Sequence, residues 1–373
     1  MPEEALRSEP VRLIPGDKEK GPREGIALCL SGGGFRAMLF HAGTLWRLSE
    51  LGVLDRLDRV SSVSGGSIAS GMLAARWPVA AKDFEDEVVT PLFDLAGHHL
   101  DIPASVAGML LPGSTIAQRA AAAYDRHLYK GKTLQQLPDE PRFVFNATNL
   151  VTGVLWRFSK PYMGDYRVGR IMKPDLPLAT AVGASAAFPP PLSPLRIDLP
   201  DTGWNLDKAE LGDAFRKTAV LSDGGVYDNL GLETAWKEYE TVLVSDAGGH
   251  LADDASPSHN MLLQMPRVVK VIDGQVRALR RAQIVGSIED GTRKGAYWSM
   301  LQEAKAPGVL PVDPDRAKEL AELPTRLAKL DTETRRNLVN WGYASCDAAV
   351  RAFWVDGKDL PAPSGFPMDG GIG

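Results

Sequence analysis

Residues 26–36 read IALCLSGGGFR and residues 60–69 read VSSVSGGSIA, and these two stretches establish the type of fold. Each begins as a short apolar run and passes through glycines into a helical pattern, which is typical of strand–loop–helix. The expected elements, in chain order, are a strand over 26–30, a helix over 36–51, a strand over 60–63 and a helix over 68–76. This opening favours an α/β fold with a parallel sheet.

The rest of the chain continues the α/β pattern and then changes character. Further strands are expected over residues 142–146, 155–158, 219–222 and 242–245, and charged helices over 268–282 and 317–341. An apolar stretch at 102–111 is interpreted as core packing or, alternatively, as a mobile cap or membrane-touching element. The proline-rich segment 188–191 indicates a rigid loop. We divide the chain into a polar arm (1–24), an α/β core (25–250), a helical C-terminal extension packed on the core (251–357) and a flexible tail (358–373).

Composition narrows the function classes. The 373 residues are 44% hydrophobic and carry a formal net charge of −5, so nucleic acid is not an expected partner. The six histidines and two cysteines form no metal-binding spacing, so no metal or other cofactor is expected, and Cys29 in its apolar run reads as a buried free thiol. Because no signal-like or membrane-spanning apolar run occurs, we expect a cytoplasmic protein that contacts a membrane surface only transiently.

A first chemical motif follows the second strand. Residues 65–69, Gly65-Gly66-Ser67-Ile68-Ala69, fit a GxSxA form of the nucleophile elbow, in which small neighbours allow a strained turn that exposes a serine hydroxyl. Ser67 is the expected nucleophile, and its structural alternative is a helix N-cap. Ser185 fits the same pattern but precedes the proline cluster, so context favours Ser67.

A glycine loop follows the first strand and has two interpretations. Adjacent glycines allow backbone N–H groups to converge on an anion, so Gly32, Gly33, Gly34 and Phe35 could form an oxyanion hole. The same residues also fit a dinucleotide-binding fingerprint. That interpretation requires an acidic residue at the end of the second strand, where the sequence has serine and glycine, and is therefore the weaker one.

A candidate base stands at the end of a later strand. Asp223 precedes Gly224 and Gly225, and a strand-end aspartate projects into the crevice where α/β proteins place their sites. The alternative is an ordinary Asp-Gly turn. Asp246, followed by Ala247-Gly248-Gly249, is a rival for the same role, and no histidine stands out as the base.

Taken together, these motifs resemble the patatin-like phospholipase family. The glycine loop with Arg36, the serine elbow and the Asp-Gly-Gly segment occur in the family's order. Two softer matches support it, at residues 146–153 and at 184–190, and the second assigns Ser185 to a structural segment. The likeness covers about residues 25–250, and Ala69 departs from it because the family usually has glycine there.

The resemblance implies a three-layer α/β/α sandwich with a mostly parallel central sheet and a serine lipid acyl hydrolase of phospholipase A type. Its catalytic dyad would be Ser67 and Asp223, and Arg36 would either bind substrate headgroups or pack at the loop. The expected partner is a phospholipid or another lipid ester. A general carboxylesterase or acyltransferase, and a non-catalytic lipid- or nucleotide-binding protein, remain alternatives.

Overall fold

The computed structural model describes residues 22–100, 115–189, 192–249, 251, 253–301, 308–354 and 360–372. Several expectations therefore lie outside the described residues. They are the arm up to residue 21, the apolar stretch 102–111, residues 190–191 of the proline-rich loop, and residues 358, 359 and 373 of the tail.

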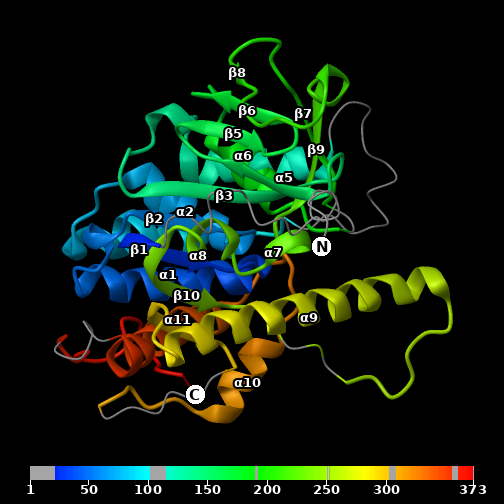
Figure 1. Cartoon of the computed structure of the whole chain (residues 1–373). Coiled ribbons are helices and arrows are strands. Elements are labelled where there is room, and N and C mark those ends of the chain that lie inside the picture. The colour runs from blue at the N-terminus through cyan, green and yellow to red at the C-terminus, as the bar shows by residue number, and fades with distance from the viewer. Residues whose placement is uncertain are drawn as a thin grey trace.

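Among the described residues, one eleven-stranded sheet forms the centre of the molecule (Figure 1). One half is parallel in the order β11-β10-β1-β2-β3, and the other half, from β4 to β9, adds antiparallel strands. The strands are β1 (Arg23–Leu30), β2 (Arg59–Ser62), β3 (Arg142–Asn149), β4 (Val154–Phe158), β5 (Tyr162–Asp165), β6 (Gly169–Met172), β7 (Leu195–Asp198), β8 (Trp204–Asn205), β9 (Thr218–Asp223), β10 (Tyr239–Asp246) and β11 (Lys294–Ser299).

Helices cover both faces of this sheet. They are α1 (Gly34–Glu50), α2 (Gly65–Arg76), α3 (Thr90–Leu95), α5 (Ile116–Tyr124), α6 (Leu178–Ser185), α7 (Gly225–Asp228), α8 (Glu233–Trp236), α9 (Met261–Glu289), α10 (Pro314–Glu322) and α11 (Thr332–Phe353). Short 3₁₀ or π segments are η2 (Leu54–Arg56), η3 (Ala81–Asp83), η4 (Glu85–Val89), η5 (Asp125–Tyr129), η6 (Leu134–Gln136) and η7 (Asp213–Phe215).

The alternation of side chains along β1 explains the three layers. Leu28 and Leu30 join the large core beneath α1, α2 and α11, whereas Ala27 and Cys29 join a smaller core beneath α8 and α9. Successive strand residues point to opposite faces, so a strand that is apolar at every position needs cover on both. The expected α/β/α sandwich is confirmed, and Cys29 is a buried free thiol as expected.

The C-terminal third differs from the expected helical extension. It contributes β11, which pairs in parallel with β10 and completes the sheet. The single helix expected over 317–341 is two helices, because Pro324 interrupts the pattern and the Asp331 side chain caps the start of α11. In the described part of the tail, 360–372, the Asn340 side chain donates hydrogen bonds to Met368 O and Gly371 O and accepts one from Met368 N–H, so this part contacts α11. The flexibility expected of the tail stays a prediction.

Candidate active site

The site forms where two strands meet end to end. β2 pairs in parallel with the first half of β3, and β9 pairs antiparallel with its second half. β2 and β9 therefore run toward one another beside β3, and their carboxyl ends meet near Asn146. This arrangement brings the loop after β2 to Asp223, the last residue of β9.

Ser64 occupies the turn between β2 and α2. Its backbone has φ 52° and ψ −120°, a conformation that costs a non-glycine residue free energy and is typical of functional turns. The glycine loop lies against it, since a Cβ on Gly32 would stand 3.1 Å from the Cβ of Ser64. Gly65 and Gly66 have no room for a side chain, because a Cβ there would lie 2.2 Å from Gly34 O and 2.4 Å from Leu30 O respectively.

Ser67, the serine expected as nucleophile, lies elsewhere. It is the third residue of α2 and is fully buried, and its hydroxyl contacts Ser62 Oγ at 3.0 Å and Ser185 Oγ at 2.8 Å. The structure therefore does not bring Ser67 to Asp223. The sequence could have indicated Ser64, because the strand expected over residues 60–63 makes residue 64 the first residue of the turn that follows it.

Asp223 is a buried carboxylate with one free oxygen. Its Oδ1 accepts a hydrogen bond from Gly225 N–H at 2.7 Å, while Oδ2 has no hydrogen-bond partner of standard geometry among the residues that the structure describes. Burial raises the pKa of Asp223 from 3.8 to about 7, and the Gly225 N–H and the nearby Ser64 hydroxyl oppose that rise. The Ser64 hydroxyl thus lies close to Asp223 without a hydrogen bond of standard geometry, as is frequent in unliganded catalytic sites.

Ser185 links the Ser64 turn to the strand that lies beside Asp223. Its hydroxyl accepts a hydrogen bond from Ser64 N–H at 3.1 Å and donates one to Asn146 O at 2.6 Å. The backbone that follows α6 holds the other partner, because Ala187 O accepts from Asp223 N–H at 2.9 Å. These contacts agree with the structural role expected for Ser185. They hold the Ser64 turn and the Asp223 carboxylate in fixed positions relative to one another.

The glycine loop keeps two of its four candidate donors available. Gly32 N–H bonds Asn229 O and Phe35 N–H bonds Arg326 O, each at 3.0 Å. Within the described part of the chain, the N–H groups of Gly33 and Gly34 have no acceptor. Their φ angles of 144° and 64° are open to glycine, and consecutive N–H groups in such a turn can point at one anion.

Arg36 packs at the loop. It is 3% exposed, and its guanidinium donates to Ala247 O, Leu323 O and Thr325 Oγ1. Burial lowers the pKa of Arg36 to about 10. Of the two roles left open by the sequence, headgroup binding does not fit these contacts. Arg36 instead fastens the segment around residue 325 over the glycine loop.

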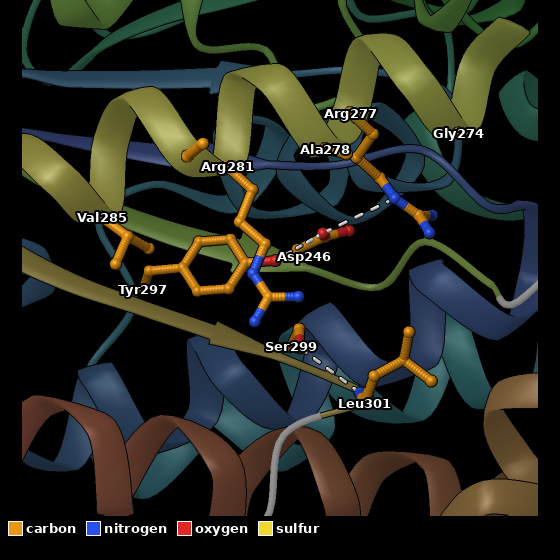
Figure 2. Close-up of a pocket in the computed structure, with 10 residues that line it drawn as sticks. Asp246, Gly274, Arg277, Ala278, Arg281, Val285, Tyr297, Ser299 and Leu301 are labelled. Atoms are coloured by element: carbon orange, nitrogen blue, oxygen red, sulfur yellow. Dashed lines mark hydrogen bonds and ion pairs between the residues drawn. The ribbon is translucent and has the colours of Figure 1, made fainter.

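The other candidate bases are committed elsewhere. His41 is fully buried between Ser31 O and Ser245 Oγ, each at 2.9 Å from a ring nitrogen, and burial lowers its pKa to about 4. Asp246 lines a separate pocket beside α9 and accepts hydrogen bonds from Tyr297 Oη at 2.7 Å and Gly248 N–H at 2.8 Å (Figure 2). Neither of them contacts Ser64.

Among solved structures, the chain is similar in part to human GIVD cytosolic phospholipase A2 and to VipD from Legionella pneumophila. The human enzyme, in complex with methyl gamma-linolenyl fluorophosphonate and terbium chloride, has a TM-score of 0.48 at 14% identity, covering 92% of this chain and 59% of its own. VipD has a TM-score of 0.34 at 15% identity, covering 85% and 66%. The chain thus spans less than two thirds of each of these proteins.

The sequence comparison is more specific. No curated protein matches the sequence. The family model for patatin-like phospholipase matches residues 28–236, which is more than half of the chain and includes the glycine loop, Ser64 and Asp223. The chain therefore belongs to the patatin-like phospholipase family.

Proposed function

We propose that this protein is a serine lipid acyl hydrolase in which Ser64 is the nucleophile and Asp223 the base. One observation supports it above the others. A serine in a strained strand–helix turn lies close to a buried carboxylate, one oxygen of which has no other partner in the described part of the chain. Family membership supports a lipid ester as substrate, with phospholipid as the first class to test.

The geometry supports a two-step acyl transfer. In the first step Ser64 Oγ attacks the ester carbonyl carbon while its proton passes to Asp223 Oδ2. The N–H groups of Gly33 and Gly34 would hold the oxyanion. The ester C–O bond then breaks, the leaving alcohol takes the proton from Asp223, and an acyl-Ser64 remains.

Water completes the cycle. Asp223 accepts a proton from the water molecule that attacks the acyl carbon, and returns it to Ser64 Oγ as the carboxylic acid leaves. A base with a pKa near 7 suits this double role, because it is ionised often enough to accept the proton and basic enough to hold it. Burial of the Asp223 carboxylate supplies that pKa.

The test is hydrolysis of mixed phospholipid vesicles by the wild type, Ser64→Ala and Ser67→Ala, with released fatty acid identified by mass spectrometry. Ser64→Ala is expected to lose activity on the order of a million-fold, because removing the nucleophile of a serine hydrolase has that effect. Ser67→Ala, which removes a buried hydroxyl away from Asp223, should keep activity within about tenfold.

Two outcomes would contradict this proposal. If Ser67→Ala were inactive and Ser64→Ala active, with both folded by circular dichroism, the nucleophile assignment would fail. If the wild type released no fatty acid from vesicles but hydrolysed a small soluble ester through Ser64, the protein would be a general carboxylesterase, and the lipid substrate would be wrong.

A further inference from the structure

Asn229 is a polar residue of the junction that the proposed mechanism does not use. It directly follows α7, the short helix after Asp223, and its backbone oxygen accepts the Gly32 N–H at 3.0 Å. Its side chain is partly buried, and among the described residues the side-chain amide forms no hydrogen bond. The packing of the protein therefore leaves the amide of Asn229 available to a molecule bound in the site.

Two glycines locate this amide between the nucleophile and the base. A Cβ on Gly32 would stand 2.3 Å from Asn229 Oδ1 and 3.1 Å from the Cβ of Ser64. A Cβ on Gly225 would stand 2.7 Å from the same Oδ1 and 3.0 Å from Asp223 Oδ1. Asn229 Oδ1 thus borders the Ser64 turn on one side and the Asp223 carboxylate on the other.

The two side chains present acceptors that cannot bond one another. Asp223 Oδ2 has no hydrogen-bond partner of standard geometry among the described residues, and in the same part of the chain Asn229 Oδ1 has none either. A carboxylate oxygen and an amide oxygen both accept, so only a molecule with two donors satisfies both of them. Water carries two O–H donors on one oxygen, whereas an alcohol carries one. A pair of acceptors beside the nucleophile is therefore suited to a water molecule.

We propose that Asn229 Oδ1 and Asp223 together hold the hydrolytic water, so that water and not an alcohol is the preferred acceptor of the acyl group. In acyl-Ser64 the serine has lost its hydroxyl proton, which leaves Asp223 Oδ2 open to one O–H of the water. The other O–H donates to Asn229 Oδ1. This inference rests on the proposed function and deepens it, because it names the residue that selects hydrolysis over acyl transfer.

The proton transfers of this step balance. The water oxygen attacks the acyl carbon while its first proton passes to Asp223 Oδ2. Its second proton stays on the attacking oxygen throughout and is only hydrogen-bonded to Asn229 Oδ1. The bond from the acyl carbon to Ser64 Oγ then breaks, Oγ takes the proton from Asp223, and the carboxylic acid leaves with the second proton.

An alcohol gains less from the same arrangement. It donates its single O–H to Asp223 and places a carbon substituent where the second water proton would lie. Asn229 Oδ1 then has no donor, and an acceptor left unpaired in a desolvated site costs roughly tenfold to a hundredfold in rate. Asn229 is accordingly expected to favour water in the second step and to leave the first step, which involves no water, almost unaffected.

The experiment measures how the acyl-enzyme partitions between water and methanol. The wild type and Asn229→Ala turn over a soluble p-nitrophenyl ester with methanol added, and mass spectrometry quantifies free acid and methyl ester. Asn229→Ala should slow deacylation by water roughly 10²-fold, because the water loses its alignment. It should also raise the ratio of methyl ester to acid at least about tenfold. A burst of p-nitrophenol and an intact-protein mass increased by the acyl group should show that acyl-Ser64 accumulates.

Two further variants separate the acceptor from packing. Asn229→Leu keeps the branching at Cγ without an acceptor and should behave as Asn229→Ala does, including where the alanine variant fails to fold. Asn229→Asp keeps an acceptor and should restore the preference for water. Its added charge should raise the pKa of Asp223 and move the acid limb of the pH–rate profile upward. Asn205→Ala is the matched control, since Asn205 is also partly buried but lies on β8 at the edge of the sheet; it should give the wild-type product ratio.

Two results would overturn the proposal. One is a wild-type product ratio in folded Asn229→Ala and Asn229→Leu. The other is equal slowing of acylation and deacylation, which would show that the amide donates to the oxyanion in both steps. In either case a wild type that forms acyl-Ser64 and releases acid leaves the proposed hydrolase standing. A wild type that forms no covalent adduct at Ser64, with the ester or with a fluorophosphonate, would show that both are wrong.

Discussion

Two strand-end aspartates, Asp223 and Asp246, have nearly the same local sequence and opposite surroundings. Each ends a strand and is followed by a glycine pair within three residues. The Asp246 carboxylate accepts hydrogen bonds from Tyr297 and Gly248, and its Oδ2 lies 3.9 Å from Arg277 Nε. Asp223 lies close to Ser64, and one of its oxygens has no hydrogen-bond partner among the residues described. The contrast shows that the partners a carboxylate meets in the folded protein determine whether it can act as a base.

The largest expected effect is on the rate of hydrolysis, which should fall when Asp223 is replaced and change little when Asp246 is replaced. Asp223→Asn should reduce kcat for lipid ester hydrolysis by about 10⁴-fold or more, because an amide cannot accept the Ser64 proton. Asp246→Asn should stay within about tenfold of wild type, since Asp246 does not contact Ser64. Steady-state kinetics on both variants checks this, and the reverse ranking would move the base to Asp246.

The glycine loop lies between the two aspartate regions and provides a second contrast. Gly34→Ala should lower kcat by about 10²- to 10³-fold, because a Cβ there would lie 2.4 Å from Arg326 O and must displace the N–H donors. Gly52→Ala is the matched control. The φ of Gly52, +63°, is within a degree of that of Gly34, but a Cβ on Gly52 would have no described atom within 4 Å. It should cost only about 1 kcal/mol of stability. Equal activity in two folded variants would argue against a role for the loop.

The weakest effect concerns stability. Because burial raises the folded-state pKa of Asp223 to about 7, the folded protein binds a proton more tightly than the unfolded chain. This contribution is fully present below pH 3.8 and is lost as the pH rises toward 7. Asp223→Asn, which removes the buried charge, should therefore raise Tm by a few degrees at about pH 8 and much less at about pH 4.5.

Asp246→Asn provides the contrast in the same measurement. It removes the carboxylate that Arg277 and Tyr297 face, so it should lower Tm at about pH 8. Thermal unfolding of the three proteins at both pH values gives the comparison. A lower Tm for Asp223→Asn than for wild type at the higher pH would show that its carboxylate is stabilised by a partner, contrary to the structure.

The sequence predicted those features that depend on local pattern. Six strands and the first two helices follow from apolar runs and glycine punctuation, and the α/β/α layering follows from a strand that is apolar on both faces. The sequence predicted the glycine loop and Asp223 as site candidates because the residues that suggest their chemistry are neighbours along the chain. The sequence did not reveal β11 in the sheet, because its apolar residues are few and its partner, β10, lies some fifty residues away.

Which polar groups meet was determined by the tertiary structure alone. Ser64 and Ser67 are three residues apart, and both lie beside glycine. Because β2 ends at Ser62 and α2 begins at Gly65, the strained turn falls on Ser64, whereas Ser67 lies within α2 and is buried in the core. The bracing by Ser185, the burial of Arg36 under residues 323–325 and the committed state of Asp246 all depend on contacts between distant segments. Local sequence limits the backbone conformations available at each turn. The desolvation and the hydrogen bonds of a serine or an aspartate, which govern its chemical reactivity, depend instead on the distant segments that pack around it.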